Sequence, residues 1–218
     1  MASTYLTRTS SSAGTNTKGT FSAWVKRSSI SNVYPRIIQI RPSSGNGLDM
    51  YFRNTDILEI KLSSGGSVLA QLSTNRLFRD VNAWYHILLS IDTTSGTADD
   101  RVRLYVNGVK ETSFSTRTNP SQNADVKING SSDTIQIGLE VGGSSNIFSG
   151  SMSHIHWLDG TAHDASYFGS TDSTTGEWKI NTSPSVTYGT NGFFILKDGN
   201  SVTDQSGNSN NFTVGGGT

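Results

Sequence analysis

The strongest constraint on the fold is a two-residue alternation of apolar and polar side chains. In residues 101–106, RVRLYV, the apolar Val102, Leu104 and Val106 alternate with arginine and tyrosine side chains. A period of two places these three residues on one face of a strand. The dipeptide Asn-Gly follows at 107–108, and both of its residues accept the positive φ of a tight hairpin turn. The stretch predicts a strand, a turn and a returning strand.

The same alternation recurs along the chain, between clusters of Ser, Thr, Gly, Asn and Asp that are typical of turns. It predicts an all-β sandwich of two antiparallel sheets with about a dozen short strands. Ile87, Leu89 and Ile91 are expected to face the core between the sheets, together with the apolar residues of 101–106. The other alternating segments are FSAWVKR (21–27), GLDMYFRN (47–54), DILEIKL (56–62), SVLAQL (67–72), TIQIGLE (134–140), GFFILKD (192–198) and NFTV (211–214).

Signals for helices are nearly absent. At most one short helical turn is expected, at residues 164–169 (DASYFG), where Asp164 is placed to cap the first turn. No linker and no shift in composition interrupts the chain. We therefore expect residues 1–218 to form a single domain.

Composition excludes several classes of function. The formal net charge is +0 and no run of Lys or Arg occurs, so a nucleic-acid partner is not expected. The absence of cysteine removes disulfides and thiolate chemistry and favours folding in a reducing cytosol. The N-terminal residues lack the apolar core of a signal peptide, and no segment approaches the ~20 apolar residues of a membrane span. Synthesis in a bacterial host cytoplasm, without membrane insertion, is the expectation.

Two motifs carry a resemblance to a known family. Residues 84–92, WYHILLSID, and 101–108, RVRLYVNG, resemble the concanavalin A-like jelly roll of the laminin-G and pentraxin kind, in which Trp opens one strand and Tyr-Val-Asn-Gly ends the next. The turn at 204–211, DQSGNSNN, resembles an Asp-x-Ser-Gly-Asn turn of that group. More narrowly, three segments resemble proteins of marine bacteriophages: residues 5–28, 148–169 and 188–216.

The resemblance implies two curved sheets, of which the concave one holds sugar in related lectins and glucanases. It also implies a virion structural protein on the particle surface, and we expect a capsid decoration protein. The alternative is a glycan-binding, receptor-recognition domain of a tail fibre or adhesin. The expected partners are other virion proteins, chiefly the major capsid protein, copies of the same chain in an oligomer or array, and a host surface glycan. The β-domain starts close to Met1, which favours attachment through its own surface.

Histidines and a tryptophan are the candidates for a ligand groove. His154 and His156 lie two residues apart, which places both on one face of a strand beside Met152 and Leu158. Such a pair can ligate a metal, but no third ligand has a fixed spacing, so no metal site is assigned. Trp157 is the third groove candidate, although alternation turns it the other way. All four tryptophans, Trp24, Trp84, Trp157 and Trp178, are candidates either for stacking on sugar or for the core, and Trp84 is expected to pack.

The turn at 204–211 is rich in oxygen ligands. Asp204, Asn208 and Asn210 are candidate ligands for a Ca²⁺ ion. A hydrogen-bonded Asx turn explains the same residues without an ion and is the preferred interpretation.

No catalytic residue is expected. Glucanases of this superfamily carry Glu-x-Asp-x-x-Glu on one strand, and none of Glu59, Glu111, Glu140 and Glu177 lies in such a pattern. The chain has no phosphate-binding glycine loop and no serine nucleophile motif. The prediction is therefore a protein that is not an enzyme.

Overall fold

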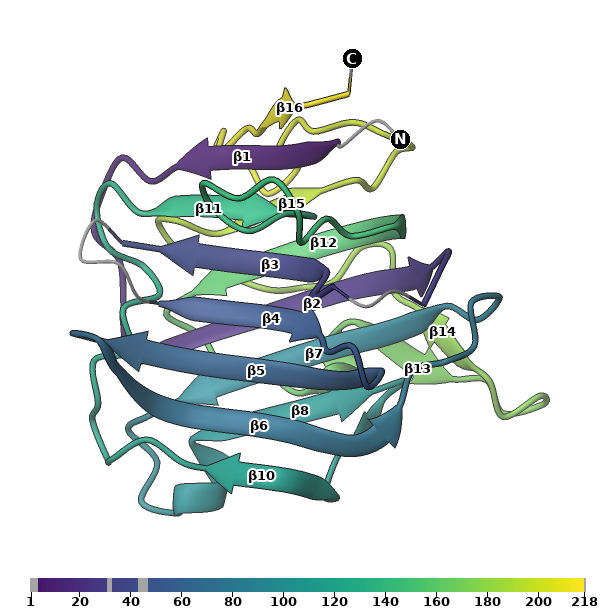
Figure 1. The fold of residues 1–218 in the computed structure, drawn as a ribbon, viewed down its shortest axis with the longest axis horizontal. Coiled ribbons are helices and arrows are strands. Elements are labelled where there is room, and N and C mark those ends of the chain that lie inside the picture. The colour runs from purple at the N-terminus through teal and green to yellow at the C-terminus, as the bar shows by residue number, and fades with distance from the viewer. Residues whose placement is uncertain (1–3, 31–32, 43–46, 218) are drawn as a thin grey trace.

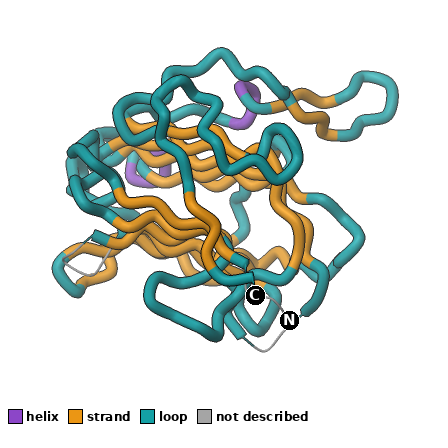
Figure 2. Tube along the Cα trace, turned by 90° about the horizontal axis from the view of Figure 1, so that it is seen from above, coloured by secondary structure: helices purple, strands orange, loops and turns teal. Residues whose placement is uncertain are grey.

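The alternating segments build two sheets that pack face to face. The computed structural model describes residues 4–30, 33–42 and 47–217. Figure 1 shows the larger sheet in front of the smaller one, and the view in Figure 2 separates the two layers. Every strand pairing in the described ranges is antiparallel. The expected all-β sandwich is confirmed.

The larger sheet has eight strands in the order β10-β6-β5-β4-β3-β11-β1-β16. The strands are β1 (Tyr5–Thr9), β3 (Arg36–Arg41), β4 (Leu48–Phe52), β5 (Ile57–Ser64), β6 (Ser67–Leu77), β10 (Phe114–Thr118), β11 (Thr134–Ile137) and β16 (Thr213–Gly215). Strand β1 pairs with β16, so segments near the two ends of the chain lie side by side. Strand β1 also pairs with β11, which leaves β16 as the edge of the sheet.

The smaller sheet has six strands in the order β15-β12-β2-β7-β8-β9. The strands are β2 (Lys18–Arg27), β7 (Tyr85–Asp92), β8 (Val102–Val106), β9 (Val109–Lys110), β12 (Gly150–Asp159) and β15 (Phe193–Ile195). A separate hairpin consists of β13 (Gly169–Thr171) and β14 (Trp178–Ile180). Two single-turn 3-10 helices complete the described ranges: η1 (Ala98–Asp100), and η2 (Ala165–Tyr167), which Asp164 caps as expected. Neither could cross a membrane.

The core lies between the two sheets and follows the alternation. The residues expected there are fully or almost fully buried and belong to one apolar cluster: Ile87, Leu89, Ile91, Val102, Leu104 and Val106. The larger sheet contributes the alternating Leu48, Met50 and Phe52 of β4, among others. The face assignment made from the sequence is confirmed for these strands.

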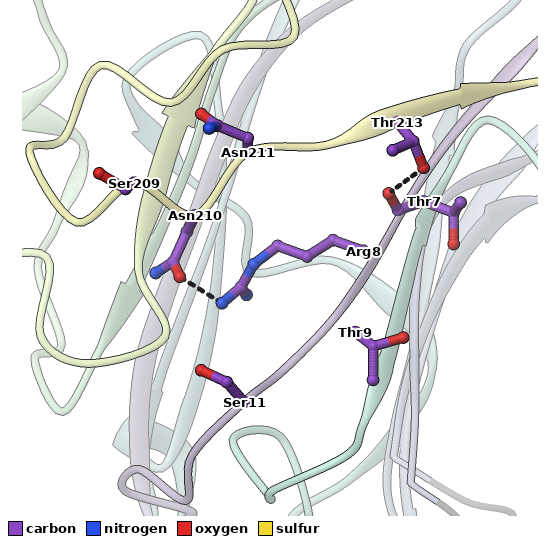
Figure 3. Close-up of a pocket in the computed structure, with 8 residues that line it drawn as sticks. All are labelled: Thr7, Arg8, Thr9, Ser11, Ser209, Asn210, Asn211 and Thr213. Atoms are coloured by element: carbon purple, nitrogen blue, oxygen red, sulfur yellow. Dashed lines mark hydrogen bonds between the residues drawn. The ribbon is translucent and has the colours of Figure 1, made fainter.

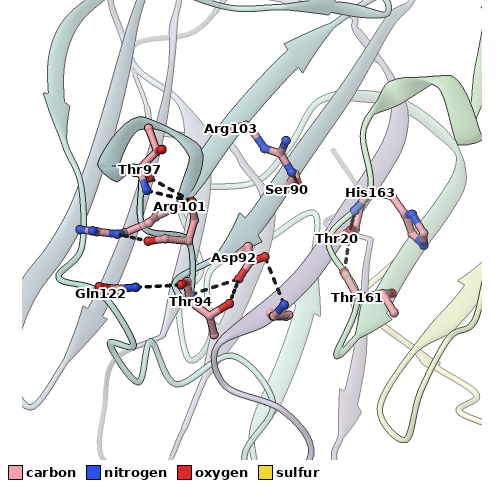
Figure 4. Close-up of polar contacts among 12 residues, drawn as sticks. Thr20, Ser90, Asp92, Thr94, Thr97, Arg101, Arg103, Gln122, Thr161 and His163 are labelled. Atoms are coloured by element: carbon pink, nitrogen blue, oxygen red, sulfur yellow. Dashed lines mark hydrogen bonds and ion pairs between the residues drawn. The ribbon is translucent and has the colours of Figure 1, made fainter.

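The outer face of the smaller sheet is covered by a third layer of loops, residues 160–190. A second apolar cluster joins Leu88 and Tyr105 of the sheet to Ala165 and Phe168 of this layer. Thr20 of β2 fastens the layer, because its hydroxyl donates to the carbonyl of Thr161 at 2.8 Å and accepts from the amide of His163 at 2.9 Å, as Figure 4 shows. The outer face of the larger sheet is not covered by this layer (Figure 2).

Trp178 of the covering layer contacts a buried histidine of the sheet. The Trp178 indole donates to Nδ1 of His86 at 3.0 Å, and Nε2 of His86 lies 2.8 Å from Oγ of Ser22. An indole can only donate, so Nδ1 of His86 is unprotonated and Nε2 carries the hydrogen. His86 is fully buried, and this burial lowers its pKa to about 4. Burial likewise lowers the pKa of His156 well below its usual value. Both histidines are therefore neutral in the folded protein at pH 7.

The hairpin at residues 107–108 has the predicted geometry. Asn107 has φ 49° and Gly108 has φ 81°, and the turn joins β8 to β9. A Cβ added at Gly108 would lie 2.3 Å from the ring of Trp178. Glycine is thus required here both by the backbone conformation and by the covering layer.

Replacing Gly108 with Ala should therefore cost more than replacing Gly176 with Ala. Both glycines have positive φ, at 81° and 73°, but an added Cβ at Gly176 has no heavy atom within 4 Å. Left-handed strain of about 1–2 kcal/mol is common to the two variants, and only Gly108→Ala displaces Trp178. Urea denaturation measures the difference. Equal losses of unfolding free energy would show that Trp178 does not press on the turn.

The buried neutral histidines predict a loss of stability in acid. An unfolded histidine titrates near pH 6.5, whereas His86 in the folded protein titrates near 4. Between these values the unfolded state binds more protons, so the unfolding free energy is highest above pH 6.5 and falls as the pH falls toward 4. His86 alone accounts for roughly 3 kcal/mol of this loss.

Denaturation midpoints measured from pH 7.5 to about 5.5 test this expectation, because carboxyl groups titrate little in that window whereas an unfolded histidine takes up most of its proton. The variant His86→Gln should show a shallower pH dependence than the wild type. A stability that stays constant over this range would contradict the assignment of neutral, buried histidines.

Candidate functional site

Two of the three predicted groove residues, His156 and Trp157, lie on the covered face of the smaller sheet or in the core. Trp157 is fully buried between the sheets, and its indole donates to Oδ1 of Asn129 at 2.8 Å. The prediction that Trp157 lines a ligand groove is wrong. His156 is 2% exposed and packs against Phe168, Tyr188 and Phe194. It faces the covering layer, so no open groove reaches it.

A β-bulge explains why simple alternation misplaces one side chain of this strand, that of Met152. The register of β12 against β2 shifts between Ser153 and His156, and His154 has φ 49°. The inserted residue changes the phase of the strand. As a result Met152 packs against the same core as Ile155 and Trp157, on the face opposite to the one expected.

The candidate metal ligands are engaged in hydrogen bonds to the protein. Nδ1 of His154 lies 2.7 Å from Oγ of Ser153, and Nδ1 of His156 lies 2.9 Å from the hydroxyl of Tyr188. Across residues 4–30, 33–42 and 47–217, no group of three or more His, Cys, Asp or Glu side chains is placed to hold a metal ion.

The turn at 204–211 is a hydrogen-bonded brace. The carboxylate of Asp204 accepts four hydrogen bonds of 2.7–2.9 Å, from the amides of Phe194, Ser206 and Asn210 and from the hydroxyl of Ser206. The side-chain amides of Asn208 and Asn210 donate to carbonyls of residues 189–192. This is the Asx-turn geometry, and these contacts account for all three candidate Ca²⁺ ligands.

An open apolar depression lies where β2, β7 and β12 meet the β13–β14 hairpin. It is lined by Trp24, Trp84, Ser153, His154 and Ile180, with a volume of about 300 Å³. The side chain of Trp84 is 40% exposed and that of Ile180 is 37% exposed. The prediction that Trp84 packs in the core is wrong. The alternation indicates the correct orientation, because it places Trp84 on the face opposite to the inward-facing Ile87.

The backbone at the depression is unusual. His154 is held in a left-handed conformation that costs energy for any residue except glycine, and such conformations cluster at functional sites. Partial burial of the His154 ring lowers its pKa, and the positive charge of Lys197 makes a smaller contribution in the same direction. His154 is thus the one predicted groove residue that lines an open site.

The outer face of the larger sheet carries a cluster of polar side chains around Glu59. This carboxylate is fully buried and accepts hydrogen bonds from the Tyr51 hydroxyl, from Arg53 at 3.0 Å and from Ser73 at 3.0 Å, and Nζ of Lys61 lies at 2.8 Å. Burial alone would raise the pKa of Glu59, but hydrogen bonds from Lys61, Tyr51 and Ser73 outweigh it and lower the pKa to about 2. Glu59 is therefore a permanent anion that organises its neighbours.

Known structures resemble the chain at low sequence identity. A protein of Bacteroides ovatus described as a "putative carbohydrate binding protein" is 16% identical with a TM-score of 0.58, covering 98% of this chain and 56% of its own length. The SAP-like pentraxin of Limulus polyphemus is 17% identical with a TM-score of 0.49, covering 71% of this chain and 69% of its own. The CBM40 of the Ruminococcus gnavus IT-sialidase is 15% identical with a TM-score of 0.45, covering 65% and 75%.

At such low identity, similarity to a solved structure shows the fold alone. The Bacteroides protein, with its TM-score of 0.58, is the structure that supports this conclusion. No curated protein sequence matches the chain significantly. A protein-family model described as the concanavalin A-like lectin/glucanases superfamily matches residues 1–166. Since this match covers most of the chain and the fold agrees with it, the protein belongs to the Laminin_G_3 family of concanavalin A-like domains, as its motifs had indicated.

Proposed function

We propose that the protein is a non-catalytic, lectin-like domain that binds a glycan at the depression of Trp24 and Trp84. The observation that carries this proposal is the exposed indole of Trp84, which lines the depression together with the half-buried Trp24, His154 and Ser153. Aromatic rings offer a flat apolar surface to the C–H face of a sugar, while neighbouring polar groups bind its hydroxyls. The indole N–H of Trp24 is buried and has no hydrogen-bond partner in the described part of the chain, so the polar contacts to a sugar would come from His154 and Ser153.

The proposal that the protein is not an enzyme is supported by the low pKa of Glu59. General-acid catalysis on a sugar needs a carboxyl group whose pKa is raised toward neutrality. The pKa of Glu59 is lowered to about 2, and its oxygens are occupied by protein donors. A carboxylate in this state stabilises the sheet and supports the tyrosine and arginine side chains around it.

We further propose that this domain lies on the surface of a bacteriophage particle, as a capsid decoration protein. The support is the resemblance of residues 5–28, 148–169 and 188–216 to marine phage proteins, together with a chain free of cysteine and without net charge. The proposed partners are the major capsid protein and further copies of the chain. The edge strand β16, whose Val214 is 58% exposed, is a surface on which another strand can pair. A tail-fibre or adhesin tip is the alternative place for a glycan-binding domain.

Replacing Trp84 with Ala should weaken glycan binding at least about tenfold while leaving stability nearly unchanged. Aromatic anchors in binding sites commonly contribute about 2 kcal/mol or more, and a tenfold change corresponds to about 1.4 kcal/mol. A glycan array identifies the oligosaccharide, and titration calorimetry measures its affinity. Tyr167→Ala is the matched control, because Tyr167 is 42% exposed and lies outside the depression. The proposal fails if the array shows no binding, or if Trp84→Ala binds as tightly as the wild type.

Mass spectrometry of purified particles should find the protein in virions and in tail-free capsids. A map of the particle should then show the domain on the capsid exterior, in contact with the major capsid protein. Recovery from isolated tails alone would favour the tail-fibre alternative, and absence from particles would refute both. Light scattering of the purified protein reports whether copies associate without the capsid.

A further inference from the structure

Arg8 is a charged residue on the inner face of a strand. In β1 the side chains of Leu6 and Arg8 point the same way, and Leu6 belongs to the core between the sheets. Arg8 is 9% exposed, and the brace at 204–211 lies over it. Burial lowers the pKa of this guanidinium while the charge of Asp204 opposes the change, and arginine stays protonated in proteins. A positive charge is thus built into the interior at the edge of the larger sheet.

The guanidinium is only partly satisfied by the protein. Its Nη2 donates to Oδ1 of Asn210. The orientation of Asn210 is determined, because its Nδ2 donates to the carbonyls of Thr190 at 3.0 Å and Gly192 at 2.8 Å, which leaves the oxygen toward Arg8. Nη1 of Arg8 is buried and has no hydrogen-bond partner among the described residues. A buried donor of a charged group without a partner is costly and rare.

Arg8 lines a cavity of about 380 Å³, which is within the size range of small-molecule sites. Figure 3 shows Arg8 extending among side chains from β1 and from the brace, with its end toward Asn210. The other lining residues carry hydroxyl or amide groups and no carboxylate: Thr7, Thr9, Ser11, Ser209, Asn211 and Thr213. The site therefore combines one fixed positive charge with a ring of neutral donors and acceptors.

We propose that this cavity binds the carboxylate of an acidic sugar, with the guanidinium of Arg8 as its principal donor. The planar guanidinium fork matches a carboxylate, and a single cation matches a single anionic group. The hydroxyl and amide side chains around it suit the sugar hydroxyls. The site is separate from the Trp24–Trp84 depression, since the two share no lining residue. The proposal does not depend on the function of that depression.

Titration calorimetry with sodium glucuronate tests the site, with glucose and sodium acetate as the two partial ligands. The wild type should bind glucuronate, and Arg8→Met should bind it at least tenfold more weakly. Arg41→Gln is the control, because it removes an equal charge from an exposed position. Trp84→Ala should bind glucuronate like the wild type, which separates this site from the depression.

Ser209→Asp provides a second test that does not alter the buried arginine. Ser209 is exposed, lines the cavity and has φ 59°, a conformation that aspartate tolerates well. Its carboxylate would occupy the anion position from within the protein, so glucuronate binding should fall at least tenfold although the fold is retained.

Three results would overturn the proposal. The first is the absence of glucuronate binding to the wild type at millimolar concentration. The second is unchanged affinity in Arg8→Met or in Ser209→Asp. The third is acetate binding as tight as that of glucuronate, which would show that the cavity takes a free anion and makes no use of the sugar.

Discussion

The structure depends on the burial of one face of each sheet against the other. Every long strand contributes its alternate residues to this shared core, and a side chain such as Leu104 gains about 1.5–3 kcal/mol by leaving water. Because the side-chain period of a strand is two, the same requirement pushes the remaining residues to the outer faces. The position of every candidate binding residue follows from which side of this core it occupies.

The outer faces of the two sheets differ in polarity and in what covers them. The outer face of the smaller sheet is apolar enough to need a cover, and residues 160–190 supply it through Phe168 and the Trp178–His86 hydrogen bond. The outer face of the larger sheet is polar, and its buried anion Glu59 is neutralised by basic and hydroxyl groups of neighbouring strands. Burial in an apolar cover makes the histidines neutral, whereas burial among donors keeps the carboxylate charged.

The two proposed sites both lie where regular structure is interrupted. The tryptophan depression borders the bulge of β12, at which an extra residue holds His154 in a left-handed conformation. The Arg8 cavity lies where the brace at 204–211 takes the place of a strand beside β1. In both places the backbone departs from the ladder, so side chains are offered to solvent in arrangements that a continuous sheet cannot produce.

The sequence by itself determined the strands, their inward faces and the Asn107-Gly108 turn, because alternation and turn chemistry are local properties. It also indicated the family through the motifs around Trp84 and Tyr105. It did not determine what covers His86 or what pairs with Arg8, since their partners are separated from them by 92 and 202 residues in the chain. The bulge at His154 was equally hidden, because one inserted residue reverses the phase of a strand without changing its composition. Only the tertiary structure decided that His156 is covered, that the outward-facing Trp84 is left open, and that Arg8 is buried with an unpartnered donor, because each outcome depends on what distant segments place against that side chain.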